Sequence, residues 1–186
     1  MKIRINPEML VGVSAVVIGV CALAVSVYET SLMREEQRAS VIPLLELSRS
    51  WSGGDSGDPE DHGRLWIHAE NVGIGPARIV SFNVTVDGVP KRTWGRAMAV
   101  LLGREQLVGY GQSTISGRTI PPDRMVNMFE LNDTEFLREI LAEFDRLDFE
   151  ACFCSIFDEC WTTSYSAFGA SQPVESCEGL DWPFVE

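Results

Sequence analysis

The 186-residue sequence is poor in basic residues, with 15 Lys and Arg against 27 Asp and Glu and a formal charge of −12. The charges cancel through residue 40, so the whole negative excess lies in the remainder of the chain. An acidic domain of this kind repels nucleic-acid phosphates and anionic lipid headgroups, and no cluster of Lys and Arg offsets the repulsion. We therefore expect no binding to nucleic acid.

Histidine is scarce, which limits the chemistry that the chain can perform. The only histidines are His62, at the end of a loop, and His68, on the polar face of an expected strand. Neither has a Ser or Cys in a nucleophile pattern, so a catalytic triad has no support. The acidic pair Asp158 and Glu159 fits a turn better than a glycosidase dyad. The sequence predicts a protein that is not an enzyme and that carries no metal or cofactor.

One loop contains four acidic residues that could supply oxygen ligands to Ca²⁺: Asp55, Asp58, Glu60 and Asp61. Their order does not match an EF-hand loop. A solvated acidic loop is the favoured interpretation.

Charge is absent between Met9 and Tyr28, and this stretch also lacks proline. About 20 apolar residues in a helix that rises 1.5 Å per residue span the ~30 Å hydrocarbon core of a bilayer. The sequence predicts a cytoplasmic tail at 1–8, a transmembrane helix at 9–28 and a helical stalk at 29–40 that Pro43 stops.

A cleaved signal peptide is the alternative, because Lys2 and Arg4 form a basic start and Ala22-Leu23-Ala24 resembles a cleavage site. The apolar run continues beyond this site and exceeds the typical ~7–15-residue core of a signal peptide, which favours a retained anchor. Basic residues near the two helix ends favour an N-terminus inside the cytoplasm only weakly. An even set of cysteines in the C-terminal part adds to that orientation.

Small residues recur along one face of the expected membrane helix, namely Gly12, Ala15, Gly19, Ala22 and Ser26. Small residues let two helix backbones approach closely, and in lipid such packing replaces the hydrophobic drive that acts in water. We expect this stripe to contact a helix of an integral membrane partner. The alternative is that membrane helices are generally rich in Gly and Ala, so that the stripe is incidental.

The remainder of the chain, 41–186, reads as a mainly β domain. The clearest alternating patterns cover 64–70 and 80–86, and the second leads into the hairpin turn Asp87-Gly88. Further strands are expected at 41–47, 113–120 and 124–131, and in a last hairpin formed by 149–157 and 161–168. The turn-rich connection at 71–77 contains glycines that permit positive φ.

Two helices are expected among these strands. A short helix is predicted over 93–102, and Asn132 with Glu135 resembles a capping box that opens a second helix running through Leu147. Six to eight strands with one or two accessory helices predict an immunoglobulin-like β-sandwich.

Three features together resemble a group of uncharacterised bacterial single-pass membrane proteins. These features are the N-terminal anchor, the connection Asn71-Val72-Gly73-Ile74-Gly75-Pro76-Ala77 and the hairpin Cys154-Ser155-Ile156-Phe157-Asp158-Glu159-Cys160-Trp161. The resemblance implies a protein of the bacterial envelope and supplies no activity.

Four of the five cysteines lie close together in the sequence, at Cys152, Cys154, Cys160 and Cys177. An even set in an exported domain predicts two disulfides. Cys152 and Cys154 lie on one face of a strand and are poorly placed to bond each other, which leaves two pairings. We favour Cys154–Cys160 with Cys152–Cys177 over Cys152–Cys160 with Cys154–Cys177. A four-cysteine zinc site is the competing interpretation, but the usual C-x₂-C spacing is missing.

These observations favour a non-enzymatic accessory or scaffold subunit of a larger bacterial membrane complex, for which a respiratory or photosynthetic complex is one suitable host. The expected location is the inner membrane, with a single span, a cytoplasmic N-terminus and a periplasmic C-terminal domain. The alternative is an envelope binding module that captures a peptide, a glycan or a metal ion.

Overall fold

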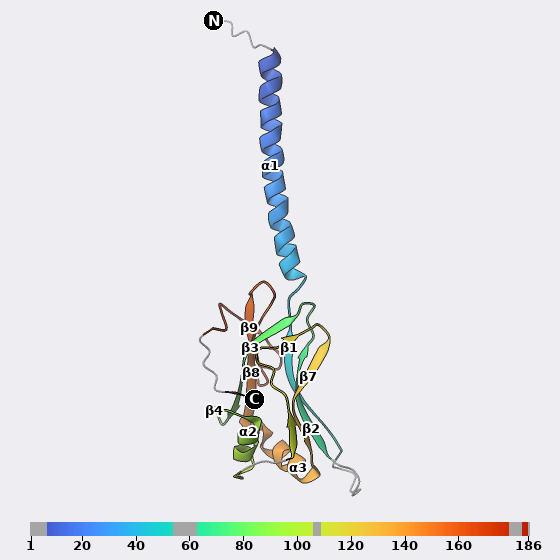
Figure 1. The fold of residues 1–186 in the computed structure, drawn as a ribbon, viewed down its shortest axis with the longest axis vertical. Helices are drawn as coiled ribbons and strands as arrows, with labels where there is room; N and C mark the ends of the chain where they lie inside the picture. Colours follow the sequence, from blue (N-terminus) through green and yellow to red (C-terminus); the bar gives the residue numbers. More distant parts are fainter. Residues whose placement is uncertain (1–6, 54–62, 106–108, 179–183, 186) are drawn as a thin grey trace. The chain divides into compact units, whose positions relative to one another are not determined.

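The computed structural model describes residues 7–53, 63–105, 109–178 and 184–185 (Figure 1). The chain divides into two compact units, Met1–Ser40 and Val41–Glu186. The second unit begins where the sequence analysis placed the start of the β-rich domain.

The first unit is one helix, α1, which runs without a break from Pro7 to Ala39. Proline suits the first turn of a helix because its missing N–H would have no partner there. The described side chains of α1 are all exposed, including the apolar ones. An 18-residue stretch of α1 has a mean hydropathy of 2.6, and this value and the length of the helix are those of a helix that can cross a bilayer; a signal sequence has the same features.

Two antiparallel sheets form the second unit (Figure 1). The first sheet has the order β1-β2-β7-β5, with bounds β1 Leu45–Ser52, β2 Arg64–Asn71, β7 Arg124–Asn132 and β5 Tyr110–Gln112. The second has the order β10-β9-β8-β3-β4, with bounds β10 Gln172–Val174, β9 Cys160–Ser164, β8 Leu147–Cys154, β3 Ala77–Val86 and β4 Val89–Lys91. The short strand β6, Thr119–Ile120, pairs with the start of β3.

Both sheets contribute to the main hydrophobic core. On β1, for example, Leu45 and Leu47 are buried whereas Glu46 is exposed, as the two-residue period of a strand requires. Helix α2, Trp94–Leu101, begins after Thr93, whose hydroxyl accepts a hydrogen bond from the Arg96 N–H. It places the Trp94 ring in the core, with centroids 5.5 to 6.0 Å from those of four phenylalanines: Phe82, Phe129, Phe149 and Phe184.

Helix α3 covers Thr134–Glu143 and continues as the short 3₁₀ helix η1, Phe144–Arg146. Its cap is Asp133, whose carboxylate accepts hydrogen bonds from the N–H groups of Glu135 and Phe136. The predicted cap, Asn132, was wrong: it is the last residue of β7 and its side chain accepts from Arg64 instead. The predicted helix end was also wrong, because Leu147 already pairs with Val86 between β8 and β3.

The prediction of a mainly β domain is confirmed, and so is the hairpin at Asp87-Gly88, where both residues have positive φ between β3 and β4. Several boundaries were wrong. The first strand starts at Leu45 rather than at residue 41. Both strands of the last hairpin end earlier than predicted, β8 at Cys154 rather than at residue 157 and β9 at Ser164 rather than at residue 168.

The strand predicted at 113–120 is largely a loop, of which only Thr119 and Ile120 pair as β6. Gly117 has a φ of +75° within a turn, which breaks the extended backbone. The extended residues in this region lie earlier, at β5.

Candidate functional site

The connection from α1 to the sheets is held by the side chain of Asn71, the last residue of β2. Its Nδ2 donates to the carbonyls of Gly75 and Ile120, at 2.8 and 2.9 Å. Its Oδ1 accepts from the N–H groups of Leu44 and Gly73, at 3.3 and 3.1 Å. Because Asn71 is fully buried and uses both donors and both acceptor positions, its side chain is completely satisfied.

Backbone hydrogen bonds extend this arrangement along the linker, residues 41–44. The Val72 N–H donates to the Leu44 carbonyl at 2.9 Å, and the Ile74 N–H donates to the Ile42 carbonyl at 3.1 Å. We call residues 41–44 together with Asn71, Gly73 and Gly75 the linker clamp. It ties the residues that follow α1 to the end of β2 and to the strand β6.

The two glycines of the clamp serve a purpose other than the one predicted. Neither has a positive φ, so backbone freedom does not explain them. A Cβ at Gly75 would lie 1.8 Å from the Val41 carbonyl oxygen, and a Cβ at Gly73 would lie 2.2 Å from the Leu44 nitrogen. Glycine is required here because the linker backbone lies directly against the turn.

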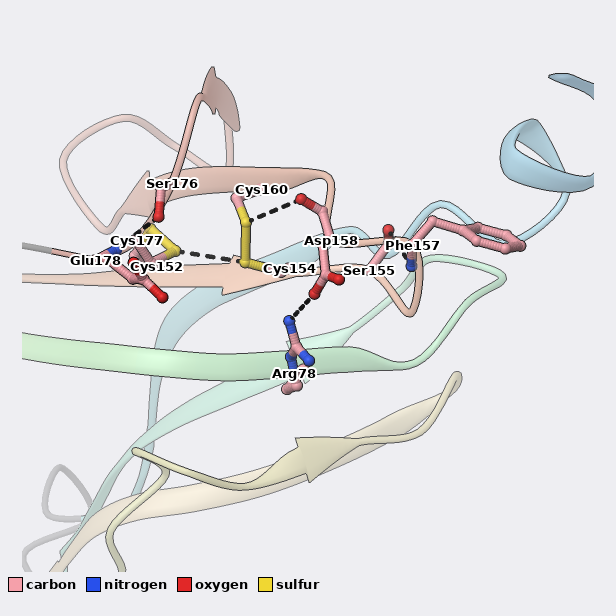
Figure 2. The surroundings of a disulfide bond; sticks show 10 residues. All are labelled: Arg78, Cys152, Cys154, Ser155, Phe157, Asp158, Cys160, Ser176, Cys177 and Glu178. Atoms are coloured by element: carbon pink, nitrogen blue, oxygen red, sulfur yellow. Dashed lines mark hydrogen bonds and ion pairs between the residues drawn. A yellow bond between two sulfur atoms is a disulfide. The ribbon is translucent and has the colours of Figure 1, made fainter. Parts of the chain in front are cut away.

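The cysteines of β8 and β9 form a second notable cluster (Figure 2). Disulfides join Cys152 to Cys177 and Cys154 to Cys160, which is the pairing that the sequence analysis favoured. Cys154 and Cys160 lie directly opposite each other in the β8–β9 register. The sulfur atoms of Cys154 and Cys177 are 3.7 Å apart, so the two disulfides touch and form a small core of their own.

The turn between β8 and β9 is fixed from several sides. Asp158 has a φ of +60°, which aspartate tolerates better than most residues, and its carboxylate pairs with Arg78 at the start of β3. The Ser155 hydroxyl accepts from the Phe157 N–H at 3.1 Å. Figure 2 shows the Phe157 ring extending away from the hairpin. The pair Asp158 and Glu159 thus forms a turn, as predicted.

The sulfur atoms of Cys154, Cys160 and Cys177 lie within 4.8 Å of one another, the spacing of a metal site. Metal binding by cysteine requires thiolates, and all three sulfurs are bound in disulfides here. The oxidised cluster is therefore a structural element that fastens the chain after β10 to β8.

The small-residue stripe of Gly12, Ala15, Gly19, Ala22 and Ser26 lies on α1, where every one of these residues is exposed. Apart from the neighbouring backbone of α1 itself, no described atom would come within 4 Å of a Cβ at Gly12 or Gly19. The fifth cysteine, Cys21, is free and exposed on the same helix. The partner helix predicted for the stripe stays a prediction.

His68 lies on β2 between Ser48 of β1 and Asn127 of β7. Although the sequence placed it on a polar face, it is buried, and its Nδ1 has no hydrogen-bond partner among the described residues. Burial lowers the pKa of His68, and the nearby Glu70 carboxylate opposes part of that change. His62 and the acidic residues Asp55, Asp58, Glu60 and Asp61 lie outside the described residues.

The role of Asn71 at the centre of the clamp was not predicted, because residues 71–77 were interpreted only as a turn. A buried asparagine is not distinguishable from a turn asparagine by its neighbours in sequence, since both occur next to glycine and proline. The available signal was the pair of glycines, which indicates a close backbone contact as readily as a turn.

No model of a known protein family matches this chain, and a comparison with curated proteins found no match.

Proposed function

We propose that the protein is a non-enzymatic accessory or scaffold subunit of a larger bacterial membrane complex. In this proposal α1 is retained as a membrane anchor and packs against an integral membrane partner through the stripe of small residues. The β domain stands on the periplasmic side and braces or covers the same partner. A respiratory or photosynthetic complex is one host of suitable architecture.

The observation that carries the proposal is the linker clamp. A subunit that only needed to be tethered could use a loose linker. Here the linker begins within two residues of the end of α1 and is fastened by a buried side chain and by two glycines that admit its backbone. Because only Ser40 lies between α1 and the fastened linker, the connection between helix and domain is short, which favours a role in which both act on one partner.

The two disulfides support an oxidising location, since such bonds persist in the periplasm and are rare in the cytoplasm. This can be tested by placing a cysteine at Glu105, an exposed position in the loop after α2. In spheroplasts, a membrane-impermeant maleimide should label Glu105→Cys without lysis. Labelling only after lysis would contradict the periplasmic orientation.

We also propose immunoglobulin-like character for the sandwich. The order β1-β2-β7-β5 corresponds to strands ABED of that fold, and β3-β8-β9 corresponds to CFG, with β4 beside β3 as an extra edge strand. The disulfides differ from the pattern in antibody domains, because they join β8 to β9 and to the tail rather than one sheet to the other. An experimental structure compared strand by strand tests this assignment.

The partner of α1 is tested by photo-crosslinking in the native membrane. A photoreactive amino acid at Ala15 lies on the stripe, and the same amino acid at Val17 lies about 160° away around the helix, at 100° per residue. We expect a specific crosslinked band from position 15 and a much weaker one from position 17.

Native gels after extraction in mild detergent provide the second readout. The wild-type chain should migrate in a larger complex, and Gly19→Leu should release it whereas Val17→Leu should not. A solitary monomer, or equal crosslinking from both positions, would contradict the proposal.

A further inference from the structure

A groove of about 440 Å³ lies along the open edge of β1. One wall is formed by β1 itself, including Ser48, Arg49 and Trp51, and the other by the turn after β9, including Tyr165 and Phe168. Phe168 has a φ of +52° and is 97% exposed, and Trp51 is 53% exposed. Large exposed aromatic residues on two sides of a groove are typical of binding surfaces.

The wall formed by β1 presents backbone groups that have no partner strand. Among the residues that the structure describes, β1 is the end strand of its sheet and pairs only with β2. The Val72 N–H donates to the Leu44 carbonyl, which sets the alternation, so even-numbered β1 residues bond to β2. The N–H and C=O groups of Leu47 and Arg49 are therefore directed to the open edge.

Arg49 follows Leu45 and Leu47 on the inner face of β1 and brings a cation to the end of the core. Its guanidinium carbon lies 3.9 Å from the centroid of the Phe144 ring, 5.5 Å from that of Trp51 and 5.8 Å from that of Tyr165. Its Nη1 is shut off from water and has no hydrogen-bond partner among the described residues. The aromatic rings thus hold the guanidinium in place, and its Nη1 is left without a partner among the described residues.

Arg104 has both a stacked aromatic ring and an ion pair, whereas Arg49 has only stacked rings among the described residues. It also stacks on a phenylalanine, with its guanidinium carbon 4.5 Å from the Phe136 centroid. Unlike Arg49, it donates to both carboxylate oxygens of Glu139, at 2.9 and 3.0 Å. Within the described part of the chain, Arg49 forms no ion pair although the protein is strongly acidic. A carboxylate supplied from outside would complete the same arrangement.

We propose that this groove binds an extended peptide that adds a strand to the open edge of β1 and places a carboxylate on Arg49. The edge supplies main-chain hydrogen bonds, and the exposed rings of Trp51 and Phe168 receive side chains of the peptide. A glycan would leave the alternating backbone groups of β1 unmatched, so the edge favours a peptide. The inference does not depend on the partner of α1.

The experiment uses the full chain in nanodiscs and a bead library of random pentapeptides, each synthesised with a free C-terminal carboxylate and with an amide. Affinities of enriched peptides are then measured by fluorescence anisotropy for the wild type, Arg49→Gln and the matched control Arg104→Gln. We expect Arg49→Gln to weaken binding at least tenfold and Arg104→Gln to change it less than twofold. Hydrogen exchange should show new protection at the amides of Leu47 and Arg49 in the peptide complex.

The two forms of the library distinguish the source of the carboxylate. Binders that are lost on amidation place their C-terminus on Arg49, whereas binders that survive amidation and are lost on Asp→Asn or Glu→Gln exchange use a side chain. The proposal is overturned if neither form of the library is enriched, or if enriched peptides bind Arg49→Gln as well as wild type.

A charged residue that points inward from an edge strand can also serve to prevent edge-to-edge aggregation. Light scattering separates this role from ligand binding. An Arg49→Gln variant that self-associates while peptide binding is absent from the wild type would assign Arg49 to that protective role and overturn the proposal.

Discussion

Replacing Asn71 by leucine should destabilise the β domain more than any comparable polar substitution on its surface. The change keeps the branched outline of the side chain, although leucine is somewhat larger than asparagine, and removes all four hydrogen bonds that Asn71 makes in the clamp. The Leu44 and Gly73 N–H groups are only partly buried, so water can replace the lost acceptor for both. The carbonyls of Gly75 and Ile120 lie in the buried part of the clamp and lose the Nδ2 donor. Ile120 keeps its pairing with Ala77 of β3, so the Gly75 carbonyl is the group most affected.

The magnitude follows mainly from the buried Gly75 carbonyl. An unsatisfied buried polar group costs about 1–3 kcal/mol, so we expect the free energy of unfolding to fall by about 2 kcal/mol. That is a large part of the ~5–15 kcal/mol typical of a native domain. The assay is guanidinium unfolding of the full chain in detergent, followed by tryptophan fluorescence with both disulfides intact.

The matched control is Asn132→Leu, since Asn132 is exposed and its side chain bonds only at the surface, to Arg64. It should change stability by less than about 0.5 kcal/mol. Hydrogen exchange adds a local readout, because the Leu44 amide loses its acceptor in Asn71→Leu and should exchange faster. A loss below about 1 kcal/mol for Asn71→Leu, with unchanged exchange at Leu44, would refute the role assigned to the clamp.

Three further predictions concern the glycines, the disulfides and His68. Gly75→Ala should lower the free energy of unfolding by about 1–3 kcal/mol, because the new Cβ meets the Val41 carbonyl. In the control Gly111→Ala the new Cβ would meet nothing closer than 3.7 Å, so the loss in the same unfolding assay should be less than about 1 kcal/mol. Replacing Cys152 and Cys177 together by alanine should lower the free energy of unfolding by about 3.5 kcal/mol, because this disulfide closes a loop with a sequence separation of 25. Replacing Cys154 and Cys160 should lower it by about 2 kcal/mol, because the separation there is 6. The reverse order of denaturation midpoints would contradict the loop-entropy argument. Because burial lowers the pKa of His68, the unfolded chain takes up its proton first as the pH falls through about 6.5, so stability should decrease between pH 7.5 and 5.5, and His68→Gln should flatten that part of the profile. An identical pH profile in the variant would show that other groups control this range.

The sequence predicted those parts of the fold that depend on local patterns. The apolar run at 9–28 predicted α1, and Asp87-Gly88 predicted a tight hairpin, because both signals lie within a few residues. The favoured disulfide pairing also followed from a local argument, the placement of two cysteines across one hairpin.

Features that depend on distant contacts could not be predicted in this way. The helix that follows β7 ended early because Leu147 is taken up by pairing with β3, some 60 residues away in the chain. The clamp unites Leu44, Asn71 and Ile120, and the groove unites β1 with the turn after β9. In each case the local sequence does not indicate which distant residue will become the structural neighbour.

The clamp also sets an order of events during synthesis. The linker leaves the ribosome early, but its partner Asn71 follows 27 residues after Leu44, and Ile120 follows 49 residues after Asn71. The residues next to α1 therefore stay unfastened until more than half of the chain has been made. Any factor that receives the nascent chain meets this linker as an open segment, with the whole of α1 already synthesised and the domain still unfolded.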